Sequence, residues 1–510
     1  MNATYGVVAV VLVSLATLTI GAFGLRISRT TSDFYVASRS VRPWLNSSAI
    51  GGEYLSAASF LGVAGLVLAF GANMLWFPIG WTAGYLLLLV FVAAPLRRSG
   101  AFTIPDFAEI RLQSNAVRRA ATVLVVLVGW LYLLPQFQGA GLTIRTVTGA
   151  PTWVGTVLVA TIVVINVVSG GMRSITFVQA FQYWLKLTAL LVPAFFLIRA
   201  WIGDGAPGPG APAEWTLPFH APSGPDLYVV YSVMIATFLG TMGLPHVVVR
   251  FYTNPDGHAA RRTTLIVLAL LGVFYLLPTI YGALGRIYAS DLIDAGRVDA
   301  VVLELPHRIL GSSGDLLAAL LTAGAFAAFL STSSGLTMSV AGVIGQELAR
   351  SGRLRRRMGS TALGERGGIS SVTALRVAAA GCVLVPLALA LTVQRLPVAT
   401  SVTFAFALAA STFCPLLVLG IWWRGLTAPG AVAGLAAGGV GAGLAPLVRT
   451  AIDTTATWRM FVDYPAAWSV PLGFGVMIAV SLATRSRVPT RVSRTMVRLH
   501  TPEGAHLDRG

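Results

Sequence analysis

Charged residues are scarce in this chain. Of its 510 residues, 11% are charged and 55% are hydrophobic, whereas a soluble domain has roughly 25% and 45–50%. Apolar runs of about 20 residues, the length that crosses a bilayer core, recur along almost the whole sequence. The composition therefore excludes an ordinary soluble protein and indicates an all-α polytopic membrane protein.

Cysteine and lysine are nearly absent as well. Cys382 and Cys414 lie in separate apolar runs, so the chain cannot form a dense disulfide framework. Lys186 is the single lysine. The six histidines are scattered, and neither a metal-ligand spacing such as HExxH nor a nucleophile motif occurs. We therefore expect no enzymatic activity and no catalytic residues.

Hydropathy predicts about thirteen transmembrane spans. They cover residues 5–25, 44–70, 74–96, 120–145, 152–169, 174–199, 228–250, 264–286, 314–346, 370–393, 398–422, 428–449 and 466–485. The spans at 44–70 and 314–346 exceed the length of a straight crossing, so we expect them to be tilted or broken. A disordered tail is expected after about residue 486.

The placement of arginine predicts the orientation. With the N-terminus outside and the C-terminus inside, 27 arginines face the inner side and 8 the outer side, which agrees with the positive-inside rule. The first span is not a cleaved signal peptide, because no basic residue precedes it and Arg26 and Arg29 follow it.

The same distribution accounts for the net charge of +17. The charge belongs mainly to inner loops and the tail, so the expected partner is the lipid bilayer of a bacterial inner or plasma membrane and not a nucleic acid. The sequence does not determine an oligomeric state, and a monomer would suffice.

Glycine, proline and hydroxyl residues cluster inside three spans, where irregular backbone is tolerated only if it lines a protected cavity. The first cluster, Ile50 to Ser59 (IGGEYLSAAS), includes the carboxylate of Glu53. Close helix packing would also explain its small residues, but an intramembrane carboxylate indicates a functional site. The second cluster, Thr237 to His246 (TFLGTMGLPH), is interpreted as a helix break or as a proline kink that ends the span.

The third cluster is the hydroxyl run Ser331-Thr332-Ser333-Ser334. Membrane serines and threonines often bond back to their own helix. Two adjacent hydroxyls together with free carbonyls from a broken helix would also provide the oxygen ligands that a small hard cation prefers. Both interpretations stay open on this pattern alone.

At these residues the sequence resembles the sodium:solute symporter family, and within it the cation/acetate symporters. The resemblance extends over roughly residues 30–425. It is carried by EYLSAASFLGVAG from Glu53 to Gly65, GLPHVVVRFYT from Gly243 to Thr253, the turn Ser169-Gly170-Gly171-Met172 and the ninth span.

The resemblance implies a leucine-transporter-like fold of five-plus-five inverted repeats. The expected organisation is a leading helix and inner loop at 1–43, a core at 44–425 with repeats at about 44–200 and 227–425, two extra helices within 426–485 and a cytoplasmic tail at 486–510. Transport would occur by alternating access, with a cation gradient driving solute uptake.

The resemblance also implies a site for Na⁺ as the coupling ion. Matched residue by residue, its ligands would be the carbonyls of Gly52, Leu55 and Ala328 and the hydroxyls of Ser331 and Thr332. The chain departs from the family at Gln179, where many members have an Asp. Any second ion site, or a proton-linked step that uses that Asp, is therefore in doubt.

The expected solute position lies between the two broken helices, where helix N-termini attract a carboxylate. Its candidate lining is Ser56, Ala57, Ser59, Gln136, Thr237, Thr241 and Met242. Two polar residues beside Pro135, Gln136 and Gln138, are expected either to face this cavity or to form bonds between helices. A lining without a buried arginine clamp suits a monocarboxylate better than a dicarboxylate.

Four further residues have open roles. Glu53 is expected to bond the unwound backbone or to add negative potential at the cation site, with a proton-carrying role as the alternative. His246 is a weak proton-relay candidate, and a structural bond to a loop carbonyl is the preferred interpretation. Lys186 is expected to extend its ammonium group to the membrane surface, to have a structural role or to contact the substrate. Arg250 is expected to close an inner gate or to meet lipid headgroups.

Together these observations predict a secondary active symporter that couples inward Na⁺ flow to uptake of a small monocarboxylate such as acetate, propionate or pyruvate. The alternative is a Na⁺- or H⁺-coupled symporter of another small solute, such as an amino acid.

Overall fold

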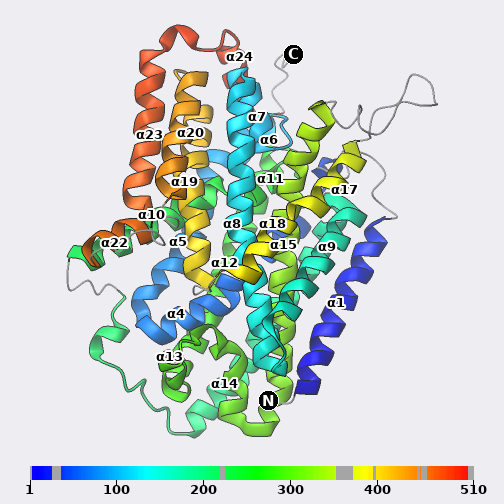
Figure 1. Ribbon diagram of the computed structural model, residues 1–510, viewed down its shortest axis with the longest axis vertical. Helices are drawn as coiled ribbons and strands as arrows, with labels where there is room; N and C mark the ends of the chain where they lie inside the picture. Colours follow the sequence, from blue (N-terminus) through cyan, green and yellow to red (C-terminus); the bar gives the residue numbers. More distant parts are fainter. Residues whose placement is uncertain are drawn as a thin grey trace.

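The computed structural model describes residues 3–25, 36–218, 224–351, 371–393, 398–444, 448 and 456–503. These residues form helices and connecting segments, with no β-strand among them (Figure 1). The α-helices are α1 (Ala3–Leu25), α3 (Pro43–Tyr54), α4 (Val63–Phe70), α5 (Trp76–Leu87), α6 (Ala93–Arg98), α7 (Ile104–Leu112), α8 (Asn115–Thr148), α9 (Thr152–Gly203), α10 (Gly224–Gly243), α11 (Pro245–Phe251), α12 (Gly257–Tyr288), α13 (Asp291–Asp294), α14 (Val301–Leu310), α15 (Asp315–Ser351), α17 (Ser371–Cys382), α18 (Leu384–Thr392), α19 (Val398–Trp422), α20 (Ala428–Gly443), α22 (Ala456–Asp463), α23 (Ala466–Ala483) and α24 (Val492–His500).

Within these ranges, ten helices are long and apolar enough to cross a membrane. One of them, Thr152–Gly203, contains two predicted spans, 152–169 and 174–199. It turns at Gly171, which has φ 60° and ψ −164°, a conformation that favours glycine because it has no Cβ. The membrane-protein prediction is confirmed, while the number thirteen and the orientation stay predictions.

The two long predicted spans behave differently. The span at 44–70 is interrupted, because α3 ends at Tyr54 and a π-helical turn follows at Ala58–Gly62. The span at 314–346 lies in one continuous helix, α15. Of the two expectations for this span, tilted or broken, the break is excluded, since α15 contains no proline and serine and threonine can satisfy their hydroxyls within a helix; the tilt stays a prediction.

The centre of the molecule is built around α9. This helix packs against α1, α3 and α15, while α10 packs against α5 and α19, and α20 against α23. In Figure 1, α1 begins near one end of the longest axis and α24 lies at the other. The arrangement brings α3, α9, α11 and α15 together, and these helices carry most of the predicted cation-site residues.

The tail is more ordered than its composition suggests. The expectation of disorder after residue 486 is wrong for residues 492–500, which form α24 and pack against α6. Met496 and Leu499 are buried on one face of this helix, a spacing typical of an amphipathic helix. Beyond it, Glu503 pairs with Arg98 at 3.3 Å.

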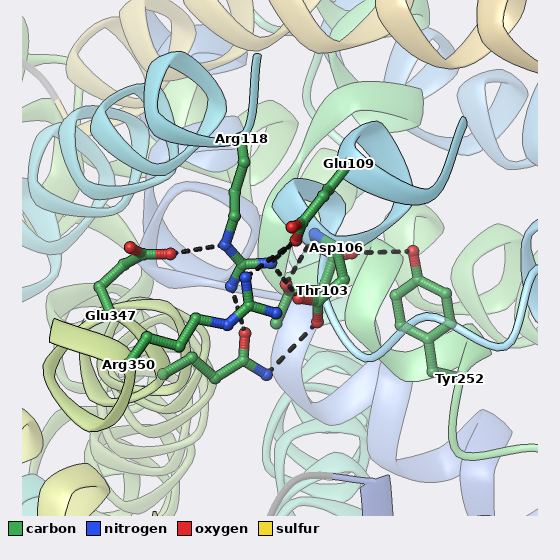
Figure 2. Close-up of polar contacts among 8 residues, drawn as sticks. Thr103, Asp106, Glu109, Arg118, Tyr252, Glu347 and Arg350 are labelled. Carbon is green, nitrogen blue, oxygen red and sulfur yellow. Dashed lines mark hydrogen bonds and ion pairs between the residues drawn. The ribbon is translucent and has the colours of Figure 1, made fainter. Parts of the chain in front are cut away.

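A buried arginine joins three helices at the end of the molecule predicted to face the cytoplasm (Figure 2). Arg118, at the start of α8, pairs with Asp106 and Glu109 of α7 at 2.5 and 2.8 Å and with Glu347 of α15 at 2.6 Å. Arg350 of α15 also pairs with Glu109, at 2.9 Å. Because the Arg118 side chain is only 2% exposed, water cannot replace these contacts readily.

We expect Arg118→Ala to destabilise the protein strongly. Removing one partner of a buried ion pair costs about 3–5 kcal/mol, because the remaining charges lose their compensation. Thermal unfolding of the purified protein in detergent should show a clear drop in Tm. Arg119→Ala is the matched control, since its side chain is exposed; equal Tm values for the two variants would contradict the role given to Arg118.

Candidate functional site

The first helix break lies at Leu55 and Ser56. Leu55 has φ −72° and ψ 85°, which ends α3, and the helix resumes through the π-helical turn at Ala58–Gly62. Gly52 lies so close to α9 that an added Cβ would approach the carbonyl oxygen of Gln179 to 2.0 Å. The break frees carbonyl groups of α3, and these need new partners in a dry environment.

The second break lies at Leu244, between α10 and α11. Leu244 is extended, with φ −67° and ψ 119°, and Pro245 begins α11, a position where the missing N–H costs nothing. Gly240 and Gly243 allow close contact with α19, because added Cβ atoms would lie 2.5 Å and 2.4 Å from its carbonyl oxygens. The interpretation of this cluster as a helix break is therefore confirmed.

The hydroxyl run of α15 faces the first break. The Thr332 hydroxyl donates to the carbonyl of Glu53 at 2.6 Å, and the Ser331 hydroxyl donates to the carbonyl of Ala328 at 3.1 Å. The hydroxyls of Ser333 and Ser334 have no hydrogen-bond partner among the described residues. Ser331 and Thr332 thus lie against α3, as the family resemblance implies.

Lys186 reaches the same place from α9. Its side chain is fully buried, and its ammonium group donates to the carbonyl of Gly52, to the carbonyl of Leu55 at 2.7 Å and to the Ser331 hydroxyl oxygen at 3.0 Å. The suggestion that Lys186 snorkels is wrong, because its partners are oxygens inside the helix bundle rather than headgroups.

Three of the five proposed sodium ligands, at Gly52, Leu55 and Ser331, therefore surround an ammonium nitrogen. We call the oxygens of Gly52, Leu55 and Ser331 that accept from Lys186 the oxygen cluster. In this arrangement the residues do not fit Na⁺, because the ion would share these acceptors with a second positive charge. Two unit charges 4 Å apart repel by roughly 4 kcal/mol at an effective dielectric constant of 20.

A buried ion pair lies beside the oxygen cluster. Arg250 of α11 donates to the Glu53 carboxylate at 2.5 Å and to the Thr176 hydroxyl at 2.9 Å, and it also donates to the Gln179 side-chain oxygen. The Gln179 amide in turn donates to the carbonyl of Ser331 at 2.8 Å. These bonds link α3, α9, α11 and α15 into one polar network.

This network corrects two expectations. The Glu53 carboxylate pairs with Arg250 instead of bonding the unwound backbone. Arg250 can reach it because α11 places this arginine inside the helix bundle. Arg250 is 1% exposed, so it does not meet lipid headgroups. Gln179 connects the ion pair to α15 without adding a charge.

The proposed solute-lining residues are all buried. Around the first break, the backbone N–H of Ala57 donates to the Gln136 side-chain oxygen at 3.0 Å, and Ser59 bonds the Tyr275 hydroxyl at 2.9 Å. The Ser56 hydroxyl oxygen accepts from the N–H of Ala58 at 3.2 Å. The first break is therefore surrounded by side chains from α8 and α12 as well as its own.

On α10, Thr237 and Thr241 bond carbonyls of their own helix at 2.8 Å. Thr241 also contacts the Tyr54 hydroxyl at 2.7 Å, which connects the two broken helices. Met242 is buried but has no polar atom to contribute to this contact. Gln138 donates to the carbonyl of Val393 at 3.2 Å and lines a separate cavity, away from Gln136.

His246 is fully buried at the start of α11, edge-on to the Tyr132 ring with centroids 5.2 Å apart. Neither ring nitrogen has a hydrogen-bond partner among the described residues. The expected bond to a loop carbonyl is therefore not formed, because the ring points inward to α8. The side-chain N–H₂ of Gln136, one helical turn beyond Tyr132, also lacks a partner among those residues.

Sequence reasoning missed the aromatic side chains around the breaks. Trp81 lies against Tyr275 and Phe406, with ring centroids 5.8 and 5.9 Å apart, and Phe406 lies 6.3 Å from Tyr54 and 5.9 Å from Tyr132. Single aromatic residues in apolar spans carry no distinguishing signal. Their convergence from five helices becomes visible only in the fold.

The chain is similar to two bacterial proteins over most of its length. The chain is 29% identical over 526 residues to the uncharacterized symporter YwcA of Bacillus subtilis (strain 168), with full coverage of both proteins. It is 30% identical over 488 residues to a monocarboxylic acid transporter of Corynebacterium glutamicum, covering 88% of this chain and 86% of that protein.

Two solved structures share the fold. A Na⁺-coupled sialic acid symporter in a substrate-bound outward-open state superposes with a TM-score of 0.68 at 14% identity, covering 93% of this chain and 98% of the other. A nucleobase-cation-symport-1 family transporter, closed with bromovinylhydantoin bound, gives 0.53 at 13%, covering 92% and 99%. These likenesses show the expected leucine-transporter-like fold.

The relatives and the fold are those of transporters and not of enzymes. They also identify a multi-pass protein of the plasma membrane. The sequence model of the sodium:solute symporter family matches residues 34–438, which include both helix breaks, the hydroxyl run and the buried ion pair. The chain therefore belongs to the sodium:solute symporter family.

Proposed function

We propose that this protein is a secondary active symporter that couples inward cation flow, with Na⁺ as the coupling ion, to the uptake of a small monocarboxylate such as acetate, propionate or pyruvate. The monocarboxylic acid transporter at 30% identity supports the solute class. The family and the Na⁺-coupled sialic acid symporter support the ion.

The observation that carries the solute proposal concerns two buried side chains near the first break: the Gln136 N–H₂ group and the ring nitrogens of His246 have no hydrogen-bond partner among the described residues. Gln136 contacts Ala57, and His246 packs on Tyr132, one turn before Gln136 on α8. Buried donors in native proteins nearly always have partners. A bound carboxylate has about four acceptor positions and would accept from the Gln136 amide and an imidazole N–H.

The surroundings favour a short acid with one charge. Lys186 and Arg250, the two buried cations near the breaks, already bond the oxygen cluster and Glu53. Neither is free to clamp a second carboxylate. The aromatic rings of Trp81, Tyr275 and Phe406 offer an apolar surface, which suits the methyl or ethyl group of acetate or propionate.

A cavity of about 540 Å³ lies at the end of the molecule predicted to face outward. Its lining includes Gln138, Arg145, Arg297 and Asp299. Because Glu304 pairs with Arg297, the charges at this cavity are close to balance.

An amino acid is the main alternative solute. It would need an acidic or carbonyl partner for its ammonium group, and the nearest carboxylate, Glu53, is engaged by Arg250. Inhibition of uptake by acetate and propionate, but not by alanine or glycine, is the result that distinguishes a monocarboxylate site from an amino-acid site.

We expect liposomes containing the purified protein to accumulate [¹⁴C]acetate when an inward Na⁺ gradient is imposed. Ser331→Ala should reduce this accumulation about tenfold or more, because it removes one of the hydroxyls next to α3. The measurement is initial uptake rate with Na⁺, and with choline in its place.

The outcomes test the solute class and the coupling ion separately. No acetate uptake under any ion gradient would exclude the solute class. Uptake that is equal in sodium and choline, and that survives Ser331→Ala, would retain the solute and exclude sodium coupling at α15. Thr373→Ala is a matched control, because Thr373 is exposed on α17.

We also expect Glu53→Gln to lower uptake by a similar factor at every pH from mildly acidic to mildly alkaline. The substitution leaves the buried Arg250 charge without its carboxylate, a loss that costs about 3–5 kcal/mol in buried pairs, and it removes no titrating step. Proton-gradient-driven uptake lost at acidic pH alone would instead identify Glu53 as a proton carrier. Asp291→Asn is the control, because that carboxylate is 64% exposed in its pair with Arg308.

A further inference from the structure

The single lysine of the chain is placed where the family resemblance puts a metal ion. Lys186 is fully buried, and its nitrogen is bonded to Gly52, Leu55 and Ser331, three of the five residues assigned to Na⁺. An ammonium group has three N–H donors and no acceptor. Each donor has one oxygen acceptor in the oxygen cluster, so its hydrogen-bonding capacity is fully used.

An ammonium group and Na⁺ make similar demands on their surroundings. Both are compact single positive charges, and both are stabilised by carbonyl and hydroxyl oxygens. The freed carbonyls of α3 therefore gain from Lys186 the compensation that they would otherwise gain from a bound ion. The difference is that the ammonium is covalently tethered to α9.

The local charge balance also argues against a sodium ion beside the Lys186 ammonium. The polar network formed by α3, α9, α11 and α15 contains two cations, Lys186 and Arg250, and one carboxylate, Glu53, already paired at 2.5 Å. Gln179 adds no negative charge. A sodium ion at the oxygen cluster would bring three positive charges against one negative charge, which a buried region tolerates poorly.

We propose that the Lys186 ammonium is the resident cation of the oxygen cluster, so that Na⁺ binds these oxygens only when the lysine side chain has withdrawn from them. The proposal rests on the cation-coupled function given above and specifies how its cation site is controlled. Lys186 acts as a built-in competitor of sodium, and it holds α3, α9 and α15 together when no ion is bound.

Removing the ammonium should therefore create an accessible sodium site. In Lys186→Met the side chain keeps a similar length but carries neither charge nor donor. The carbonyls of Gly52 and Leu55 and the Ser331 hydroxyl would then lack a partner. Sodium can satisfy these oxygens, so the variant should bind Na⁺ more tightly than the wild-type protein does.

The test measures ²²Na⁺ binding to the purified full-length protein, together with Tm in Na⁺ and in K⁺ at equal ionic strength. We expect Lys186→Met to bind sodium about tenfold or more tightly than wild type, and its Tm to rise in Na⁺ but not in K⁺. The double variant Lys186→Met/Ser331→Ala should lose both effects, which ties them to the oxygen cluster.

Equal sodium affinity in wild type and Lys186→Met would overturn the proposal, and so would tighter binding that survives in the double variant. If Lys186→Met does not fold, sodium binding by wild type and by Ser331→Ala still tests the proposal. Tight sodium binding by wild type that Ser331→Ala abolishes would show that the ion displaces the lysine without hindrance, against the proposal. Weak binding by wild type that Ser331→Ala abolishes supports the proposal, whereas binding that Ser331→Ala leaves unchanged overturns it.

These measurements contain no solute. They therefore succeed or fail independently of whether a monocarboxylate is transported, whereas the liposome experiment tests the solute directly. A failure of one proposal can thus be recognised without ambiguity about the other.

Discussion

The interruption of α3 at Leu55 and Ser56 is the constraint on which the centre of the molecule depends. A broken helix inside a membrane leaves carbonyl groups that water cannot reach, and each must be compensated by the protein. Lys186 compensates the carbonyls of Gly52 and Leu55, and the Thr332 hydroxyl compensates that of Glu53. The packing of α3 against α9 and α15 follows from these bonds.

The sequence was a good guide to the local features. Glycine and proline at Gly51-Gly52 and at Gly240 to Pro245 indicated both breaks, because these residues weaken a helix by their own chemistry. The hydroxyl run from Ser331 indicates either bonds within its own helix or oxygen ligands for a cation. The helix through this pair proved continuous, so the polar run marked a contact with α3 and not a third break.

The sequence was a poor guide to partners. Glu53 and Arg250 are separated by 197 positions, and Lys186 and Gly52 by 134, so nothing in the local pattern joins them. An isolated lysine or arginine in an apolar run is equally compatible with snorkelling, a gate or an ion pair. The choice depends on which helices are neighbours, and that is a property of the fold.

The dependence on one lysine gives the protein an unusual chemical surface. Since Lys186 is the only lysine and is fully buried, the folded chain exposes no ε-amine, and every exposed basic side chain other than histidine is an arginine. Reagents that acylate ε-amines have no other side chain of that kind to modify. Their reaction with this protein reports how often the core around α9 opens.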